Sequence, residues 1–99
     1  MQKKIHLVAG ARPNFMKIAP IVRALSKQNI LTYRIIHTGQ HYDPEMNEVF
    51  FEELGIPQPD IFMGVGGGSH AQQTAKIMTA FEEYCQNDMP DAVLVVGDV

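Results

Sequence analysis

Short apolar segments alternate with longer amphipathic ones, and this alternation constrains the fold more than any other feature of the sequence. Four segments have the composition of strands: residues 4–9, 32–37, 61–65 and 92–96. Three segments with helical spacing of apolar residues separate them: residues 13–28, 45–54 and the stretch from Ser69 to about residue 87. Strands that alternate with helices imply right-handed crossovers and a parallel sheet. We therefore predict an α/β fold, a partial doubly wound Rossmann-like sheet with strand order 3-2-1-4.

The last predicted strand, residues 92–96, is apolar without interruption. Such a run is typical of a strand that is buried on both faces, yet the predicted order places it at an edge of the sheet. An uncovered apolar edge invites pairing with another chain. We therefore expect the 99-residue chain to self-associate through residues 92–96, and the pattern is explained most simply if the chain is a fragment of a longer protein.

The predicted helices carry local signals at their ends. Ser69 and Gln72 have the spacing of a capping box, which predicts a helix start. Gly55 is expected to end the second helix. The third helix is expected to bury one face, made of Ile77, Met78, Phe81, Tyr84 and Cys85.

Length and composition exclude several classes of protein. The chain of 99 residues, 45% of them apolar, suffices for one small globular domain or for part of a larger one. No apolar run is long enough to span a membrane, and the first residues lack the apolar region of a signal peptide. Cys85 is the only cysteine, which excludes an intrachain disulfide and favours a cytoplasmic location. No Cys/His spacing predicts a metal site.

Charged residues are segregated along the chain. Residues 1–34 contain seven of the eight Lys and Arg residues and no Asp or Glu, although the net charge is −3. This acidic total argues against a nucleic-acid-binding protein, which usually has a broad basic face. The basic first third is compatible with a small anionic ligand, or with solvated surface alone.

The strongest candidate site lies where the first predicted strand meets the first helix. Gly10 follows the strand directly, and a helix start at this point leaves free backbone N–H groups at the carboxyl edge of the sheet, where anions bind. Arg12 and Lys17 add two cations. Arg can bind a phosphate bidentately, and Lys acts as a point charge. The pattern predicts a site for a phosphorylated ligand, and the alternative is a capped helix with two solvated cations.

Further candidates follow the other strands. Asp98 comes directly after the last strand and is a candidate general acid or base, with a helix N-cap as the alternative. Gln40, His41 and Asp43 follow the second strand, and His41 is a candidate for substrate binding or proton transfer, with a structural loop histidine as the alternative. The glycine run at residues 66–68 before the third helix is weak evidence for a phosphate site.

The two familiar nucleotide-binding fingerprints are absent. Gly10-Ala11-Arg12-Pro13 is not the start of a G-x-G-x-x-G motif, and the chain has no G-x-x-x-x-G-K-[ST] motif. A dinucleotide site and a P-loop ATPase are therefore not supported. His6, inside the first strand, and Cys85 are expected to have structural roles.

Three motifs together closely resemble the amino-terminal part of the UDP-N-acetylglucosamine 2-epimerase family. They are Gly-Ala-Arg-Pro-Asn-Phe-Met-Lys-Ile-Ala-Pro at residues 10–20, Thr-Gly-Gln-His at residues 38–41, and the segment at residues 90–98 that ends in Gly-Asp. The resemblance covers essentially the whole chain, with the motifs in family order and at family spacing. The Arg12-Pro13 pair and the Lys-Ile-Ala-Pro of residues 17–20 are similar to the non-hydrolysing branch, since the hydrolysing branch typically lacks the Arg-Pro pair.

The resemblance implies a two-domain fold of the glycosyltransferase-B type. Residues 1–99 are then the amino-terminal portion of the first Rossmann-like domain, and the rest of that domain and the second domain are absent from the chain. It implies an isomerase of polysaccharide biosynthesis that interconverts UDP-GlcNAc and UDP-ManNAc by elimination and re-addition of UDP, without a cofactor. The parent protein is expected to be a homodimer, and the fragment alone is expected to be inactive.

The resemblance also implies roles for individual residues. Asp98 matches an active-site acid proposed for proton transfer, and Arg12 and Lys17 match cations placed where the charge of the leaving diphosphate develops. The residues expected to bind the substrate are Gly10, Arg12, Pro13, Lys17, Gln40 and His41.

Three other functions stay open at this point. A hydrolysing epimerase would release free ManNAc and UDP, and a glycosyltransferase of the same fold would leave C2 of the sugar unchanged. A non-catalytic flavodoxin-like or receiver-like module is the third. A receiver needs acidic residues after its first strand, where this chain has Gly10 and Ala11.

Overall fold

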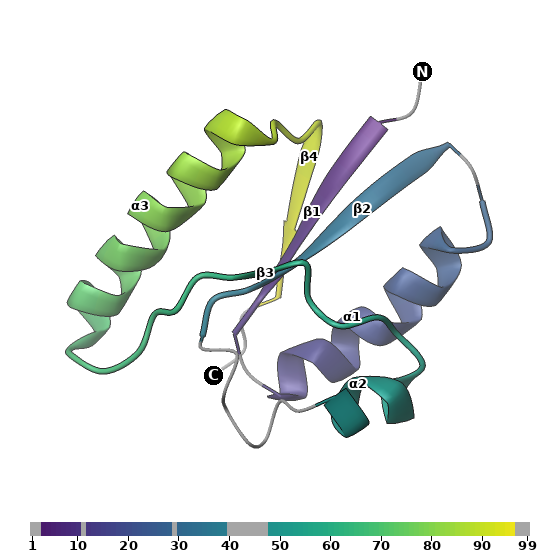
Figure 1. Cartoon of the computed structure of the whole chain (residues 1–99), viewed down its shortest axis with the longest axis horizontal. Helices are drawn as coiled ribbons and strands as arrows, with labels where there is room; N and C mark the ends of the chain where they lie inside the picture. Colours follow the sequence, from purple (N-terminus) through teal and green to yellow (C-terminus); the bar gives the residue numbers. More distant parts are fainter. Residues whose placement is uncertain (1–2, 11, 29, 40–47, 97–99) are drawn as a thin grey trace.

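The computed structural model describes residues 3–10, 12–28, 30–39 and 48–96, and there the predicted alternation is confirmed. The order of elements is β1 (Lys3–Ala9), α1 (Arg12–Leu25), β2 (Leu31–His37), α2 (Glu48–Leu54), β3 (Ile61–Phe62), α3 (His70–Asn87) and β4 (Ala92–Val95). The strands form one parallel sheet in the predicted order β3-β2-β1-β4. Helices α1 and α2 lie on one side of this sheet and α3 lies on the other (Figure 1).

Two element ends differ from the prediction by three residues, for identifiable reasons. Strand β3 stops at Phe62 rather than at residue 65, because residues 63–65 turn to donate hydrogen bonds to carbonyls at and beyond the end of β2. Helix α1 stops at Leu25 rather than at residue 28. The Gln28 side chain donates to the Leu25 carbonyl (2.7 Å) and accepts from the Leu31 N–H (2.8 Å), which joins the end of the helix to the start of β2. The predicted start of the second helix at residue 45 lies outside the described residues.

The hydrophobic core lies between the sheet and helices α1 and α2. Its fully buried members include Leu7 and Ile35 from the sheet and Phe15 and Ile18 from α1. The ring of Phe15 meets that of Phe51 edge to face, with centroids 5.3 Å apart. Burial of one such side chain stabilises the fold by about 1.5–3 kcal/mol. This packing fixes the orientation of α1. The start of the helix is therefore held in place at the carboxyl edge of the sheet.

The predicted helix signals are confirmed at both positions. Gly55 follows α2 with a positive φ of 75°, a conformation that glycine adopts without strain. At the start of α3 the Ser69 hydroxyl accepts from the Gln72 N–H (3.2 Å), and the Gln72 side chain accepts from the Ser69 N–H (2.9 Å). Ser69 is therefore engaged in capping, which favours a plain loop and helix cap over a phosphate site for the glycine run at residues 66–68.

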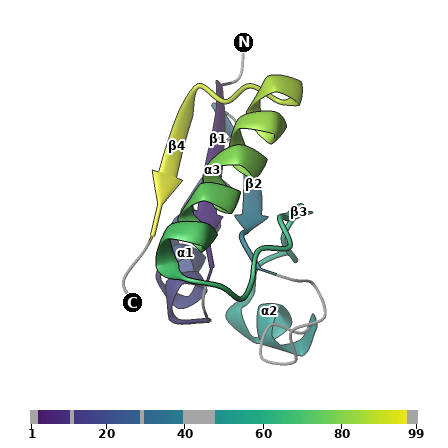
Figure 2. The same ribbon diagram turned by 90° about the vertical axis from the view of Figure 1, so that its left-hand side faces the viewer.

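On the α3 side of the sheet one burial prediction is wrong and one is confirmed. Met78 was expected on the buried face of α3, but 67% of its surface is exposed, and no residue of α3 is fully buried. The expectation that residues 92–96 form an uncovered apolar edge is confirmed, because Val93 and Val95 of β4 are exposed. Strand β4 is at the edge of the sheet and pairs only with β1 in the described part of the chain, so apolar composition did not translate into burial (Figure 2).

No helix within the described ranges combines the length and apolar character that a membrane crossing requires.

Candidate functional site

The corner between β1 and α1 has the geometry that the sequence predicted. Strand β1 ends at Ala9, Gly10 follows, and α1 begins at Arg12. The first turn of α1 contains no acidic residue, so nothing in that turn neutralises the positive end of the helix dipole. Lys17 is exposed, although Phe15 and Ile18 on either side of it are fully buried. A cation is thus carried on an anchored helix start, which is an arrangement suited to an anion.

Backbone hydrogen bonds join the segments that follow β1, β2 and β3 at this carboxyl edge. The Thr38 N–H donates to the Ala9 carbonyl (3.0 Å), the Gly64 N–H to the Gly39 carbonyl (2.9 Å) and the Val65 N–H to the Thr38 carbonyl (2.9 Å). Gly10 approaches Thr38 so closely that a Cβ added at Gly10 would lie 2.4 Å from the Thr38 hydroxyl oxygen. With Thr38 in this conformation, position 10 therefore has no room for a side chain.

His37, the last residue of β2, stabilises the same edge from inside the core. Its ring is buried and lies between the rings of Phe15 and Phe62, with centroid distances of 5.1 and 5.2 Å. Its Nδ1 accepts a hydrogen bond from the Gly39 N–H at 2.7 Å, so in the neutral ring the proton is on Nε2. A Cβ at Gly39 would lie 2.8 Å from this ring. His37 thereby fixes the loop that leads to Gln40 and His41.

The predicted site residues are only partly described by the structure. Gly10 and Pro13 lie at the corner and are exposed, like Lys17. Arg12 is the first residue of α1, and its side chain is outside the description. Gln40, His41 and Asp98 lie outside the described residues, as does Asp43, so their predicted roles stay predictions.

The end of β4 nevertheless lies next to the end of β1. The two strands pair with Val8 opposite Val95, and the Val96 N–H donates to the Val8 carbonyl (3.2 Å). Asp98 is two residues beyond Val96 in the sequence. Val96, the last residue that the structure describes, therefore lies beside the carboxyl end of β1.

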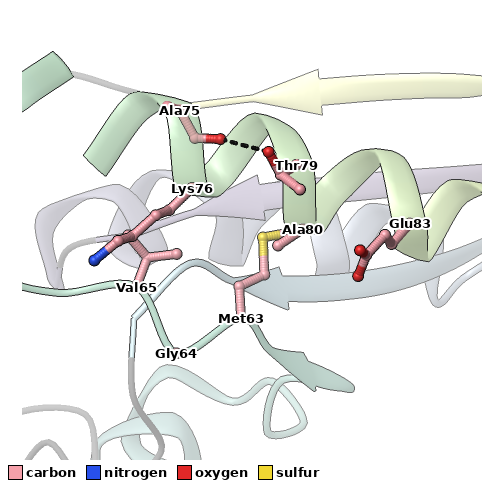
Figure 3. Close-up of a pocket in the computed structure, with 8 residues that line it drawn as sticks. All are labelled: Met63, Gly64, Val65, Ala75, Lys76, Thr79, Ala80 and Glu83. Atoms are coloured by element: carbon pink, nitrogen blue, oxygen red, sulfur yellow. Dashed lines mark hydrogen bonds between the residues drawn. The ribbon is translucent and has the colours of Figure 1, made fainter. Parts of the chain in front are cut away.

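A groove of about 420 Å³ lies elsewhere, between α3 and the segment that follows β3 (Figure 3). Its lining consists of Met63, Gly64, Val65, Ala75, Lys76, Thr79, Ala80 and Glu83. None of the predicted site residues lines it. We assign the candidate anion site to the β1–α1 corner, because Lys17 is exposed there and the first N–H groups of a helix have no intrahelical acceptor.

A second group of ionisable side chains joins β1 to the end of α3. Asp88, the C-cap of α3, pairs with Lys4 and accepts a hydrogen bond from the Tyr84 hydroxyl (3.0 Å). His6 is fully buried, with Nε2 3.7 Å from the Asp88 carboxylate and Nδ1 3.8 Å from the Cys85 sulfur. The expected structural roles of His6 and Cys85 agree with this position inside the fold.

The pKa shifts within this group indicate a structural role rather than a catalytic one. Burial lowers the pKa of His6, and burial also raises the pKa of the Cys85 thiol, so neither group is prepared for chemistry. Burial, together with the hydrogen bond to Asp88, raises the pKa of Tyr84 to about 12. The hydrogen bond from Lys4 lowers the pKa of Asp88, which therefore stays ionised and holds the end of α3 against β1.

His6 is expected to make the stability of the protein depend on pH. Above its ordinary pKa of 6.5 the imidazole is neutral in both the folded and the unfolded chain, so it has no effect. Below 6.5 the unfolded chain binds a proton that the buried ring resists, so the free energy of unfolding should fall as the pH drops toward the lowered folded pKa. Asp88 contributes in a different window, below its ordinary value of 3.8.

Urea unfolding midpoints of the full-length protein, measured from about pH 7.5 to about pH 5, test this expectation. His6→Asn should flatten the slope over this range, whereas His70→Asn, which removes an exposed imidazole, should retain it. A His6→Asn protein with the wild-type slope would show that another group is responsible.

His37 and Asp88 are the structurally important residues that sequence analysis missed. One sequence feature could have indicated the role of His37. It ends an apolar strand and is followed two residues later by Gly39. Asp88 directly follows the last helical residue, which is a common capping position, but its four partners are up to 84 residues away and no local pattern brings them together.

Comparisons with known proteins converge on one family. A family model described as UDP-N-acetylglucosamine 2-epimerase matches residues 23–99. The UDP-N-acetylglucosamine 2-epimerase of Methanocaldococcus jannaschii is 43% identical over 95 residues, which are 96% of this chain and 26% of that protein. The UDP-2,3-diacetamido-2,3-dideoxy-D-glucuronate 2-epimerase of Pseudomonas aeruginosa is also 43% identical over 95 residues, 96% of this chain and 27% of that protein.

A solved structure of a relative has the same fold. The crystal structure of the M. jannaschii UDP-GlcNAc 2-epimerase in complex with UDP-GlcNAc and UDP matches with a TM-score of 0.86 and 42% identity. The match covers 97% of this chain and 26% of that one. The present chain thus spans about a quarter of the length of these relatives.

Proposed function

Since this chain belongs to the UDP-N-acetylglucosamine 2-epimerase family, we propose that the full-length protein is an isomerase that inverts C2 of UDP-GlcNAc to give UDP-ManNAc. The family match over residues 23–99 carries this proposal. The cationic helix start at residues 10–17, which lies before the matched region, supports it independently, because a diphosphate needs such a site. In this proposal, residues 1–99 are the amino-terminal portion of the first of two Rossmann-like domains.

The proposed reaction eliminates UDP and adds it back. A base removes the C2 proton, the electron pair forms the C1–C2 double bond, and the C1–O bond to the diphosphate breaks to release UDP. Re-addition of UDP at C1, with a proton delivered to the opposite face of C2, completes the inversion. The C2 proton is not acidic, so departure of a stabilised anion has to assist its removal.

Each candidate residue has a role in this scheme. Arg12 and Lys17 stabilise the diphosphate as its negative charge develops, because fixed cations at a leaving group act on the transition state. Asp98 takes part in proton transfer at C2. Gly10, Pro13, Gln40 and His41 bind the substrate around these groups. No cofactor or metal ion has a part in the scheme.

Proton NMR of UDP-GlcNAc incubated in D₂O with the full-length protein tests the proposal. Epimerisation by this route exchanges the C2 proton with solvent, so its signal should disappear while UDP-ManNAc appears. Retention of the C2 proton with no new sugar would refute the proposal and would favour a glycosyltransferase. Free ManNAc and UDP as the products would identify the hydrolysing reaction, which the Arg12-Pro13 pair argues against.

A second substrate has equal support from the comparisons. The P. aeruginosa relative, whose name refers to UDP-2,3-diacetamido-2,3-dideoxy-D-glucuronate, is as similar to this chain as the M. jannaschii relative. Both sugars undergo the same inversion at C2 and both carry the same UDP leaving group. Values of kcat/KM measured for both substrates on the same preparation decide between them.

We also propose an oligomeric state and a cellular location for the full-length protein. The full-length protein is a cytoplasmic homodimer that takes a UDP-sugar as its partner and does not bind nucleic acid. The free thiol of Cys85 supports a reducing compartment. The isolated 99-residue chain, about a quarter of the length of its relatives, is inactive, and it self-associates through the exposed strand at residues 92–96.

A further inference from the structure

His37 is a polar ring in apolar surroundings. Only 1% of its surface is exposed, and the rings of Phe15 and Phe62 lie against it. A phenylalanine would fill the same space at lower cost, because a buried polar group loses its hydration and is compensated only by hydrogen bonds. The imidazole therefore indicates that a hydrogen bond is needed at this position.

This hydrogen bond completes the pairing of the segment that follows β2. All four backbone polar groups of Thr38 and Gly39 are hydrogen-bonded, three of them to other backbone groups. The Thr38 N–H donates to the Ala9 carbonyl, and the two carbonyls accept from N–H groups of residues 64 and 65. The fourth group, the Gly39 N–H, donates to Nδ1 of His37 at 2.7 Å. It is the one bond of this set that a single side-chain replacement removes.

Thr38 and Gly39 lie against the corner that we assign to the anion. A Cβ at Gly10 would come within 2.4 Å of the Thr38 hydroxyl oxygen, and α1 begins two residues after Gly10. Thr38 and Gly39 are half-buried, so this segment is part of the surface of the carboxyl edge. A displacement of the segment would therefore change the space at the β1–α1 corner.

We propose that His37 is a positioning residue for the isomerase reaction. Through Nδ1 it holds the Gly39 N–H, and it thereby keeps the Thr38–Gly39 segment at the distance from Gly10 that the bound diphosphate requires. The buried ring does not touch the substrate and acts through the backbone alone. This role rests on the function proposed above and adds to it a residue that no sequence motif indicated.

Two replacements of His37 separate the ring from the hydrogen bond. His37→Phe keeps an aromatic ring between Phe15 and Phe62 but has no acceptor. His37→Asn loses the ring but keeps an acceptor, because an asparagine side chain accepts from the backbone N–H two residues further on. Catalysis should therefore follow the acceptor, whereas stability should follow the ring.

The kinetic test uses the full-length protein and conversion of UDP-GlcNAc to UDP-ManNAc. His37→Phe should lose at least about tenfold in kcat/KM, mainly in kcat, because a displacement of less than about 1 Å at a catalytic site is enough for such a loss. His37→Asn should stay within about threefold of wild type in kcat/KM, although its urea unfolding midpoint should be lower because the packing of the ring is lost.

Hydrogen exchange tests the same bond without reference to catalysis. In a peptide that contains Gly39, followed by mass spectrometry, the protected amide should exchange at least about tenfold faster in His37→Phe and near the wild-type rate in His37→Asn. His70→Phe is the matched control, because it replaces an exposed histidine outside the corner, and it should keep wild-type kinetics and exchange.

The proposal is overturned if His37→Phe keeps wild-type kcat/KM, or if His37→Asn is the less active of the two variants. If His37→Asn does not fold, His37→Phe decides alone. A joint loss of Gly39 protection and of kcat/KM then supports the proposal, and wild-type values of either overturn it. A wild-type protein without epimerase activity refutes the proposed function, whereas unchanged Gly39 exchange in His37→Phe beside an active wild type overturns only the role of His37.

Discussion

Replacing Lys17 with Met in the full-length protein is expected to lower kcat/KM for the UDP-sugar by about 10²–10³-fold. Met keeps an unbranched chain of similar length but removes the charge. Lys17 is exposed on a helix whose opposite side is fixed by the buried Phe15 and Ile18, so the backbone that carries the cation is held in place before substrate binds. A fixed charge that meets the diphosphate as it leaves stabilises the transition state more than the ground state. We therefore expect kcat to fall together with kcat/KM.

Lys27→Met is the matched control, because Lys27 is exposed just beyond the end of α1 and away from the corner. It should keep wild-type kinetics. Both variants should unfold within about 0.5 kcal/mol of wild type, since both replace exposed side chains. A Lys17→Met protein with a raised KM and an unchanged kcat would show that Lys17 stabilises the bound substrate and the transition state equally. Unchanged values of both would remove Lys17 from the site.

The element order was predictable because its signals are local. Apolar runs, helical spacing, the Ser69–Gln72 capping box and Gly55 each act over a few residues, and in the described part of the chain the elements follow in the predicted order, with the cap and Gly55 at the predicted positions. Burial was less predictable, because it depends on which other elements cover a segment. The sequence of residues 92–96 is that of a central strand, but β4 has β1 as its one described neighbour and exposes Val93 and Val95.

The position of the candidate site was predictable from the sequence, but the contacts that hold its backbone in place were not. The glycine between a strand and a helix, followed by two cations, indicated the β1–α1 corner from the sequence alone. The close approach of Gly10 to Thr38 depends on the register of β1 and β2, in which Ala9 lies opposite His37. The stacking of His37 between Phe15 and Phe62 joins three elements, and no sequence spacing specifies it.

Gly10→Ala is the second change from which we expect a large effect. The new Cβ would lie 2.4 Å from the Thr38 hydroxyl oxygen, a separation that real structures do not tolerate, so the segments after β1 and β2 must move apart or the Thr38 side chain must rotate. Overpacking of this kind costs about 1–3 kcal/mol of stability. Because α1 begins two residues later, the displacement also moves Arg12 and Lys17. A misplacement of about 1 Å at a catalytic group costs up to about 10²-fold in rate, which is the loss of kcat/KM that we expect.

Removing the obstructing atom should reverse this loss, and the reversal separates a steric cause from any other. In Gly10→Ala/Thr38→Ala the nearest remaining atom is the Cβ of residue 38 at 3.7 Å, an ordinary contact. The double variant should therefore recover at least about tenfold in kcat/KM relative to Gly10→Ala, with Thr38→Ala alone as the reference for losing the hydroxyl. Gly10→Ala/Thr38→Val should not recover, because a methyl group can occupy the position of the oxygen. Equal activities of the two double variants would mean that Gly10 is required for a reason other than its approach to Thr38, such as direct contact between its backbone and the ligand.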